Sequence, residues 1–235
     1  MQKIEEYPYC FHTLSNGIRL VHRYTPSIVS HCGLTIGIGS RDEKLSENGT
    51  AHFVEHCLFK GTSKRKAYRI LDCIDGVGGE LNAFTTKEET CVYGLYLQQY
   101  NERFLELLAD IVFHSTFPEQ AIEKEKEVIL DEINSYMDTP SEQIFDDFEY
   151  RLFGNRGLGR MILGTPDKVK AMTRERLQDF VRANYTTDNM VVSTITSIPA
   201  DKWFAMCEKH LGKEPKTERT NKRSSIGIYK PTYKS

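Results

Sequence analysis

Segments with the periodicity of β-strands and segments with the periodicity of helices alternate irregularly along this chain of 235 residues. A β-hairpin is predicted between Phe11 and Tyr24, where Asn16-Gly17 separates two stretches of alternating apolar residues and favours a two-residue turn. Further strands are predicted at residues 30–40, 80–86, 90–97 and 190–198. Because no steady strand-helix-strand rhythm links them, this order favours an α+β fold with a mostly antiparallel, mixed sheet flanked by helices.

The helical segments have apolar residues at intervals of three and four, and several begin at Pro or Thr residues that favour a first helical turn. They are predicted at residues 49–60, 66–76, 102–115, 119–137, 141–152 and 199–211, with two short helices beginning near residues 166 and 173. After residue 211 the sequence is polar and basic. Residues 1–211 are therefore predicted to form one domain, and residues 212–235 a linker toward a second domain.

The composition limits the classes of partner. The chain has 31 Lys and Arg against 33 Asp and Glu, a formal net charge of −2, so no general attraction to nucleic acid or to an anionic membrane is indicated. No apolar run resembles a signal peptide or reaches the roughly 20 residues of a membrane span, and we expect a cytoplasmic protein. The 6 cysteines form no Cys-x-x-Cys pair, which argues against a disulfide framework and a thiolate zinc site.

One predicted helix carries the pattern His-x-x-Glu-His at His52, Glu55 and His56. Residues four apart on a helix lie on one face, so both imidazoles can reach a single zinc ion. Glu55 lies on the same side, close enough to act on a water at the metal. This order inverts the better known His-Glu-x-x-His motif and is typical of a catalytic zinc site. The pattern predicts Zn²⁺ bound by His52 and His56, with Glu55 as general base.

A catalytic zinc site needs a third protein ligand and keeps one position for water. The acidic helix at residues 119–137 offers four candidates, namely Glu123, Glu125, Glu127 and Glu132. Glu125 and Glu132 are seven residues apart and thus close to one helical face, so that one can bind the metal while the other supports a ligand. The helical spacing does not decide between them.

Four sequence blocks resemble, in this order, the N-terminal catalytic domain of the pitrilysin, insulysin and mitochondrial processing peptidase family. The blocks are GTAHFVEHCLFKGT, GGELNAFTTKEETCVYGL, EKEKEVILDEINSYMDTP and LGRMILGT, and the likeness extends over roughly residues 11 to 230. In that family the third zinc ligand is a glutamate at a set distance beyond the second histidine, and this spacing implies Glu132. The resemblance also implies a supporting, catalytic role for Glu125, seven residues earlier.

The resemblance further implies a function and its partners. It implies a zinc-dependent endopeptidase that binds peptides or small unfolded proteins as an added strand along an exposed edge at residues 79–85, with Asn82, Ala83, Phe84 and Thr85 as substrate-binding residues. Family members contain a second homologous domain, so a further domain, a partner subunit or a dimer is expected, and the chain alone is expected to bind zinc without cleaving efficiently. The alternative is a non-catalytic scaffold or partner subunit of such a peptidase.

Overall fold

The computed structural model describes residues 7–220 and residue 223, and within them six strands form one mixed sheet in the order β1-β2-β6-β3-β5-β4. The pairing of β2 with β6 is parallel and every other pairing is antiparallel. The strands are β1 (Tyr9–Thr13), β2 (Arg19–Tyr24), β3 (Val29–Ile36), β4 (Glu80–Thr85), β5 (Thr90–Leu97) and β6 (Met190–Thr196). The predicted α+β class with a mostly antiparallel sheet is confirmed.

Eight α-helices in the described residues accompany the sheet, and all correspond to helices predicted from the sequence. They are α1 (Thr50–Leu58), α2 (Ala67–Asp75), α3 (Asn101–His114), α4 (Glu119–Met137), α5 (Pro140–Phe153), α6 (Pro166–Lys170), α7 (Arg174–Asn184) and α8 (Ala200–Cys207). A π-helical turn at Glu208–Gly212 continues α8. None of the described helices is both long and apolar enough to cross a membrane.

The hairpin at the N-terminal end is present, but the prediction of a two-residue turn was wrong. Its loop is closed by a hydrogen bond from Leu14 N to Ile18 O at 2.9 Å, with Gly17 in the left-handed region at φ 98°. The side-chain amide of Asn16 is buried and donates to Leu211 O at 2.9 Å. The turn therefore adapts to a tertiary contact with the end of the domain, which local turn preferences do not include.

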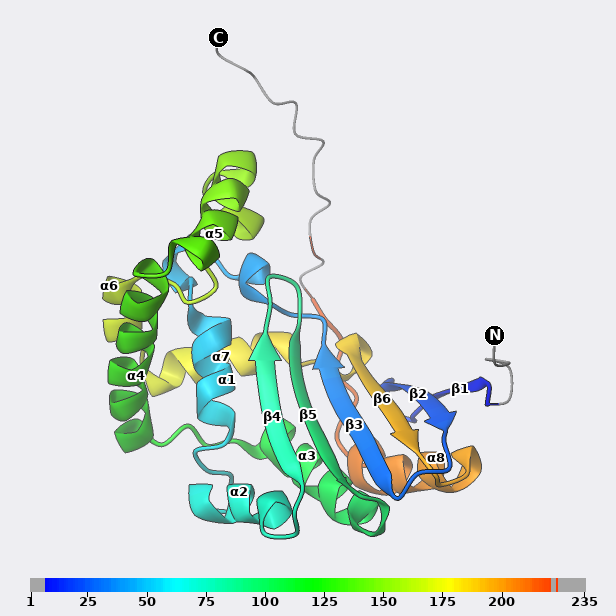
Figure 1. Ribbon diagram of the computed structural model, residues 1–235. Helices are drawn as coiled ribbons and strands as arrows, with labels where there is room; N and C mark the ends of the chain where they lie inside the picture. Colours follow the sequence, from blue (N-terminus) through cyan, green and yellow to red (C-terminus); the bar gives the residue numbers. More distant parts are fainter. Residues whose placement is uncertain (1–6, 221–222, 224–235) are drawn as a thin grey trace.

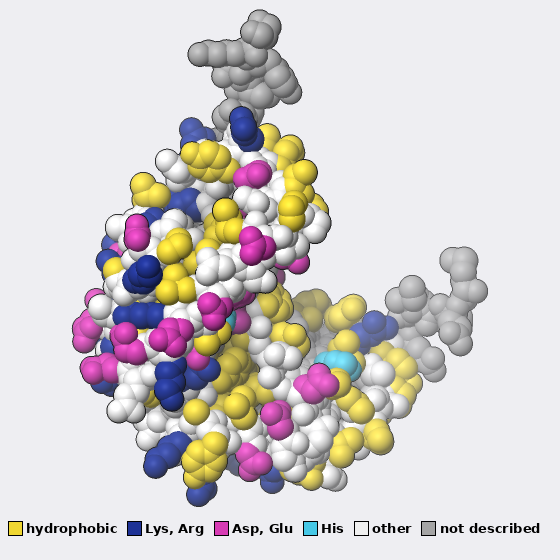
Figure 2. Space-filling model, turned by 60° about the vertical axis from the view of Figure 1, so that its left-hand side comes forward, with side chains coloured by type: hydrophobic (Ala, Val, Ile, Leu, Met, Phe, Trp, Pro, Cys, Tyr) yellow, Lys and Arg dark blue, Asp and Glu magenta, His cyan; other side chains and the backbone are white. Residues whose placement is uncertain are grey.

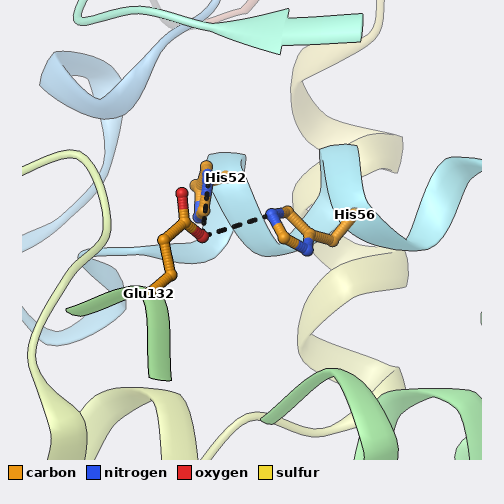
Figure 3. Close-up of side chains that lie close together, drawn as sticks. All are labelled: His52, His56 and Glu132. Atoms are coloured by element: carbon orange, nitrogen blue, oxygen red, sulfur yellow. Dashed lines mark ion pairs between the residues drawn. The ribbon is translucent and has the colours of Figure 1, made fainter. Parts of the chain in front are cut away.

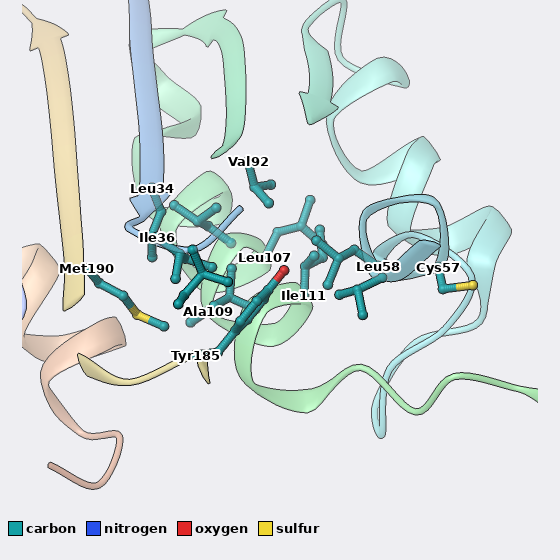
Figure 4. Close-up of a cluster of buried hydrophobic side chains, with 14 of the residues drawn as sticks. Leu34, Ile36, Cys57, Leu58, Val92, Leu107, Ala109, Ile111, Tyr185 and Met190 are labelled. Atoms are coloured by element: carbon teal, nitrogen blue, oxygen red, sulfur yellow. The ribbon is translucent and has the colours of Figure 1, made fainter. Parts of the chain in front are cut away.

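One face of the sheet is covered by helices and the other is open, as the alternating burial along β3 shows. Figure 1 shows α3 and α8 behind the strands, and α1 beside the β4 edge. Between sheet and helices lies the hydrophobic core, in which Leu34, Val92 and Met190 of the strands pack near Leu107 and Ile111 of α3 (Figure 4). The inner face of the short helix α1 is part of this core, and this packing fixes the position of the helix.

The segment after α8 is joined to the body of the domain by specific contacts. Thr187 N donates to Thr217 Oγ1 at 2.9 Å, and the guanidinium groups of Arg219 and Arg223 pair with Asp42 at 3.0 and 2.7 Å. Residues 221–222 and 224–235 of the predicted linker lie outside the described residues. That residues 212–235 connect to a second domain stays a prediction.

We expect Gly94→Ala to destabilise the domain by about 2 kcal/mol, since overpacking a core typically costs 1–3 kcal/mol. A methyl group at Gly94 would overlap the buried ring of Phe104 and lie 2.8 Å from Glu80 O. Thermal or urea unfolding measures the effect. Ser193→Ala, an exposed position of β6, is the control and should leave the unfolding midpoint unchanged; an equal midpoint for both variants would contradict this account of the packing.

Candidate metal centre

Two helices that are far apart in the sequence bring three potential ligands together. His52 and His56 lie one turn apart on α1, with ring centroids separated by 4.5 Å, and Glu132 faces them from α4. Glu132 Oε2 lies 3.7 Å from His52 Nε2 and 3.5 Å from His56 Nε2. Figure 3 shows the carboxylate pointing toward both rings. One atom of each residue lies within 4.8 Å of the others.

These separations fit the chemistry of zinc. Ligand atoms bound tetrahedrally at about 2.0–2.1 Å are roughly 3.3 Å apart, close to the two nitrogen-to-oxygen distances observed. Two imidazole nitrogens and one carboxylate oxygen form a common ligand set for catalytic zinc, which leaves a position for water. The site therefore has the donors and the spacing that a zinc ion requires.

The environment of His52 favours the neutral imidazole that a metal ligand must present. His52 is 7% exposed. Burial lowers the pKa of His52 to about 3, and the neighbouring His56 adds to the decrease. At neutral pH this ring carries no positive charge and keeps one nitrogen lone pair for a metal.

Glu125 lies behind the three candidate ligands and is paired with one of them, His56. Its buried carboxylate is 3.1 Å from His56 Nδ1, on the ring nitrogen opposite to the one that faces Glu132, and 2.6 Å from Lys60 Nζ. A carboxylate at Nδ1 holds the proton there and leaves Nε2 free to bind. Glu125 thus contacts His56 on the side away from Glu132, and the supporting role that the family resemblance implies for it stays a prediction.

Glu55, between the two histidines on α1, is half-buried where α1 packs against β4. Burial raises the pKa of the Glu55 carboxyl; polar groups of Thr85 and the His56 ring oppose the rise, and the charge of Glu132 adds to it. A carboxylate whose pKa is raised toward neutrality is a better proton acceptor at physiological pH than an ordinary glutamate.

A cavity of about 430 Å³ opens beside the candidate ligands His52 and Glu132. Its remaining lining comes from the end of β4 and the following turn, from α4 and α5, and from the loop before α6, namely Thr85, Thr86, Lys87, Tyr136, Phe145, Asp146, Glu149, Met161, Ile162 and Leu163. The ammonium group of Lys87 lies 2.8 Å from Asp146 and 3.0 Å from Glu149, so much of the charge in this cavity is already compensated.

Among the described residues, β4 pairs with β5 alone and is an edge strand of the sheet, as the family resemblance implied. Asn82 and Phe84 are exposed, and the Phe84 ring lies 5.9 Å from that of Tyr93. Ala83 instead packs against the core, and Thr85 lies close to Glu55. The four residues predicted to bind substrate therefore differ in orientation, and what they share is the backbone of one edge.

Sequence reasoning missed Lys60 and the cluster of Lys87 with Asp146 and Glu149. Lys60 follows His56 by four residues, a spacing that places it near the same side of the helix and could have suggested a partner for an acidic residue. Lys87 and α5 meet only through the tertiary fold, so no local signal indicated that pair.

A family model described as insulinase, peptidase family M16, matches residues 19–166. A second model, described as the peptidase M16 inactive domain, matches residues 171–234. The second match begins before β6, which lies between β2 and β3, so the border between the two models is not a border between folded units.

Curated relatives extend the likeness over most of the chain. An uncharacterized zinc protease of Mycobacterium leprae is 41% identical over 204 residues, which cover 86% of this chain and 46% of the relative. The beta subunit of the mitochondrial-processing peptidase of Neurospora crassa is 34% identical over 222 residues, covering 94% of this chain and 47% of the subunit. The chain spans about half the length of these relatives.

The fold also matches solved structures of proteases. Pitrilysin superposes with a TM-score of 0.87 at 17% identity, over 97% of this chain and 25% of pitrilysin. At this identity the likeness concerns the fold alone, whereas the family model and the relatives concern the sequence. The family model and the relatives show that the chain belongs to the insulinase family of peptidases, family M16.

Proposed function

We propose that this chain is the catalytic part of a zinc-dependent endopeptidase that cleaves peptides or small unfolded proteins. The observation that supports this most directly is the convergence of His52, His56 and Glu132 with Glu55 beside them. The family and the zinc proteases among its relatives support peptide hydrolysis in general. We propose in addition that the cleavage is endoproteolytic, that Glu55 is the general base, and that the substrate is an extended peptide.

In the proposed reaction, bound zinc supplies Lewis-acid chemistry, in that it lowers the pKa of a water molecule and polarises a carbonyl group. Glu55 accepts the proton of the attacking water and later donates it to the leaving amine, a transfer for which its raised pKa is suited. Glu125 holds the proton of His56 at Nδ1 and acts through that ring. Lys60 compensates the charge of Glu125.

We propose that the substrate adds to β4 as a further strand, with main-chain hydrogen bonds along the edge that ends near Glu55. Pairing through the backbone selects an extended peptide without selecting its sequence. The cavity beside His52 and Glu132 would then receive one substrate side chain, and Phe145, Met161 and Ile162 give it apolar walls.

We propose that a second homologous domain, a partner subunit or a second copy of the chain in a dimer completes the substrate-binding cleft beside β4. Helix α5 contains no fully buried residue and exposes Ile144, Phe145 and Phe148 at 62%, 70% and 61%. Figure 2 shows hydrophobic side chains on the upper lobe above a hollowed face. Large exposed apolar patches mark interaction surfaces.

The cytoplasmic location of the protein stays a prediction.

The alternative of a non-catalytic partner subunit has one observation in its favour, the match of residues 171–234 to the model of the inactive domain. Against it stands the convergence of His52, His56 and Glu132, whose potential ligand atoms all lie within 4.8 Å of one another. We therefore prefer the catalytic proposal; peptide cleavage that depends on Glu55 separates it from the alternative.

We expect Glu55→Gln to lower the rate of peptide cleavage by about a thousandfold or more, because Gln cannot accept the proton of the water. Zinc should remain bound at one ion per chain, since Glu55 is not one of the proposed ligands. Cleavage of a mixed peptide library by the complete protein, together with metal analysis, gives both values. Glu127→Gln on the exposed side of α4 is the control and should keep full activity. Cleavage by Glu55→Gln at the wild-type rate would exclude Glu55 as the general base.

We expect Glu125→Gln to weaken zinc binding by about 10-fold to 100-fold, the usual effect of removing a group that orients a ligand. The neutral amide loses the ion pair with Lys60 and holds the His56 proton less firmly. Competition with a chelator measures the dissociation constant. Glu123→Gln removes a charge from the exposed side of the same helix and should leave the constant unchanged; equal effects would show that only the net charge matters.

Peptides with N-methylated amides near the cleavage site should bind more weakly, since each methyl group removes one donor to the β4 edge. We expect KM to rise about 10-fold per hydrogen bond lost, which corresponds to roughly 1.4 kcal/mol. Steady-state kinetics on a series of such peptides tests the binding mode. A series in which no position of the methyl group changes KM would rule out pairing with the strand.

A further inference from the structure

The loop between β3 and α1 contains a buried carboxylate, that of Glu43, which has no part in the reaction proposed above. Glu43 is 5% exposed. Its Oε1 accepts a hydrogen bond from Ala51 N at 2.7 Å, and its Oε2 accepts bonds from Gly49 N at 3.0 Å and Asn48 Nδ2 at 3.1 Å. Two of these donors are backbone amides at the beginning of the helix that carries both histidines.

We propose that Glu43 is a positioning residue that fixes the first turn of α1, and with it His52, relative to Glu132; this inference rests on the proposed zinc site. The amide of Ala51, the residue directly before His52, is bonded to Glu43, so the carboxylate acts one residue away from a ligand without contacting it.

Helix α1 needs such an external acceptor because its own sequence does not provide one. It has nine residues and begins after Gly49, which has no side chain that could accept from the free amides of the first turn. A carboxylate at this end also interacts favourably with the helix dipole. Glu43, which lies outside the helix, supplies both the acceptor and the negative charge that a capping side chain would otherwise give.

The same carboxylate joins the helix to the wall of the cavity beside the metal site. Asn48, which donates to Glu43, also donates to Met161 O at 2.9 Å, and Arg160 donates to the backbone oxygen of Glu43 at 2.5 Å. Gly49 and Gly164 are in close contact as well, since a Cβ on Gly164 would lie 2.8 Å from Gly49 Cα. The start of α1 and the loop that contributes Met161 to the cavity therefore form one connected unit.

Burial destabilises the charged form of the Glu43 carboxylate more than its hydrogen-bond partners stabilise it. Burial raises the pKa of the Glu43 carboxyl to about 7, and the donors Ala51, Asn48 and Gly49, together with the charge of Arg160, oppose the rise. Groups that destabilise the folded protein are expected at functional sites, where they hold other residues in a required geometry. This destabilisation accords with a positioning role, for which the hydrogen bonds to the start of α1 are the independent support.

The test is zinc affinity of the complete protein, measured by competition with a chelator for the wild type and for Glu43→Gln. The Gln side chain has the same shape, but its NH₂ group would face backbone donors. We expect the dissociation constant to rise about 10-fold or more, as for other groups that orient metal ligands. We also expect the absorption spectrum of the Co²⁺-substituted protein to change, which loss of fold stability alone does not produce.

Asp110→Asn is the matched control, because Asp110 is also a buried carboxylate, bonded to Thr62 at 2.8 Å and to Arg65 at 2.6 Å, and contacts no residue of the zinc site. It should lower the melting temperature without changing zinc affinity or the Co²⁺ spectrum. Equal zinc affinity in Glu43→Gln and wild type, or an equal loss in Asp110→Asn, overturns the inference.

A second variant covers the case in which Glu43→Gln does not fold. Asn48→Ala removes one of the three donors to Glu43 and should weaken zinc binding in the same direction but less, whereas unchanged affinity would reject the inference. If the wild type itself binds no zinc, the proposed function fails instead. The two failures are thus distinct.

Discussion

The contact between α1 and α4 is the interaction on which the site depends. A helix of nine residues is too short to be stable alone in water, so the geometry of its two histidines is set by packing. Ala51, Phe53, Val54 and Leu58 of α1 are completely buried, which fixes the rotation of the helix. With that rotation fixed, His52 and His56 can only face α4, and Glu132 completes the set from there.

Charge explains why the cluster suits a cation. Three carboxylates converge on two histidines, namely those of Glu55, Glu125 and Glu132. Burial keeps His52 neutral. The ammonium group of Lys60 is paired with Glu125. Carboxylates gathered at a partly buried site repel each other unless a positive charge is present. A divalent cation between the two Nε2 atoms and Glu132 would balance the remaining charge, and it would do so where the ligand spacing already fits.

The sequence predicted the local parts of this site and left the long-range parts open. The four-residue spacing of His52 and His56 is a property of one helix, and the structure confirms that both rings lie on one side. Helix periodicity could not choose between Glu125 and Glu132, because both face α1; one reaches Nδ1 and the other Nε2 of the same ring. That distinction depends on the position of α4 along α1, which local periodicity does not contain and which the family resemblance supplied.

The errors and omissions have the same origin. The turn at Asn16 differs from its predicted type because its side chain bonds to residues near the end of the domain, and Lys87 was missed because its partners lie on α5. Glu43 belongs to this group too, since a glutamate six residues before Gly49 gives no local sign that it caps a helix. In the first two cases a polar side chain is bonded across a long stretch of sequence, whereas Glu43 is bonded across the loop that precedes α1. These bonds act together with the packing of α1 to give the site its particular shape. The apolar pattern is enough to specify the sheet, the helices and their order, whereas the polar contacts decide which atoms of His52, His56 and Glu132 face one another.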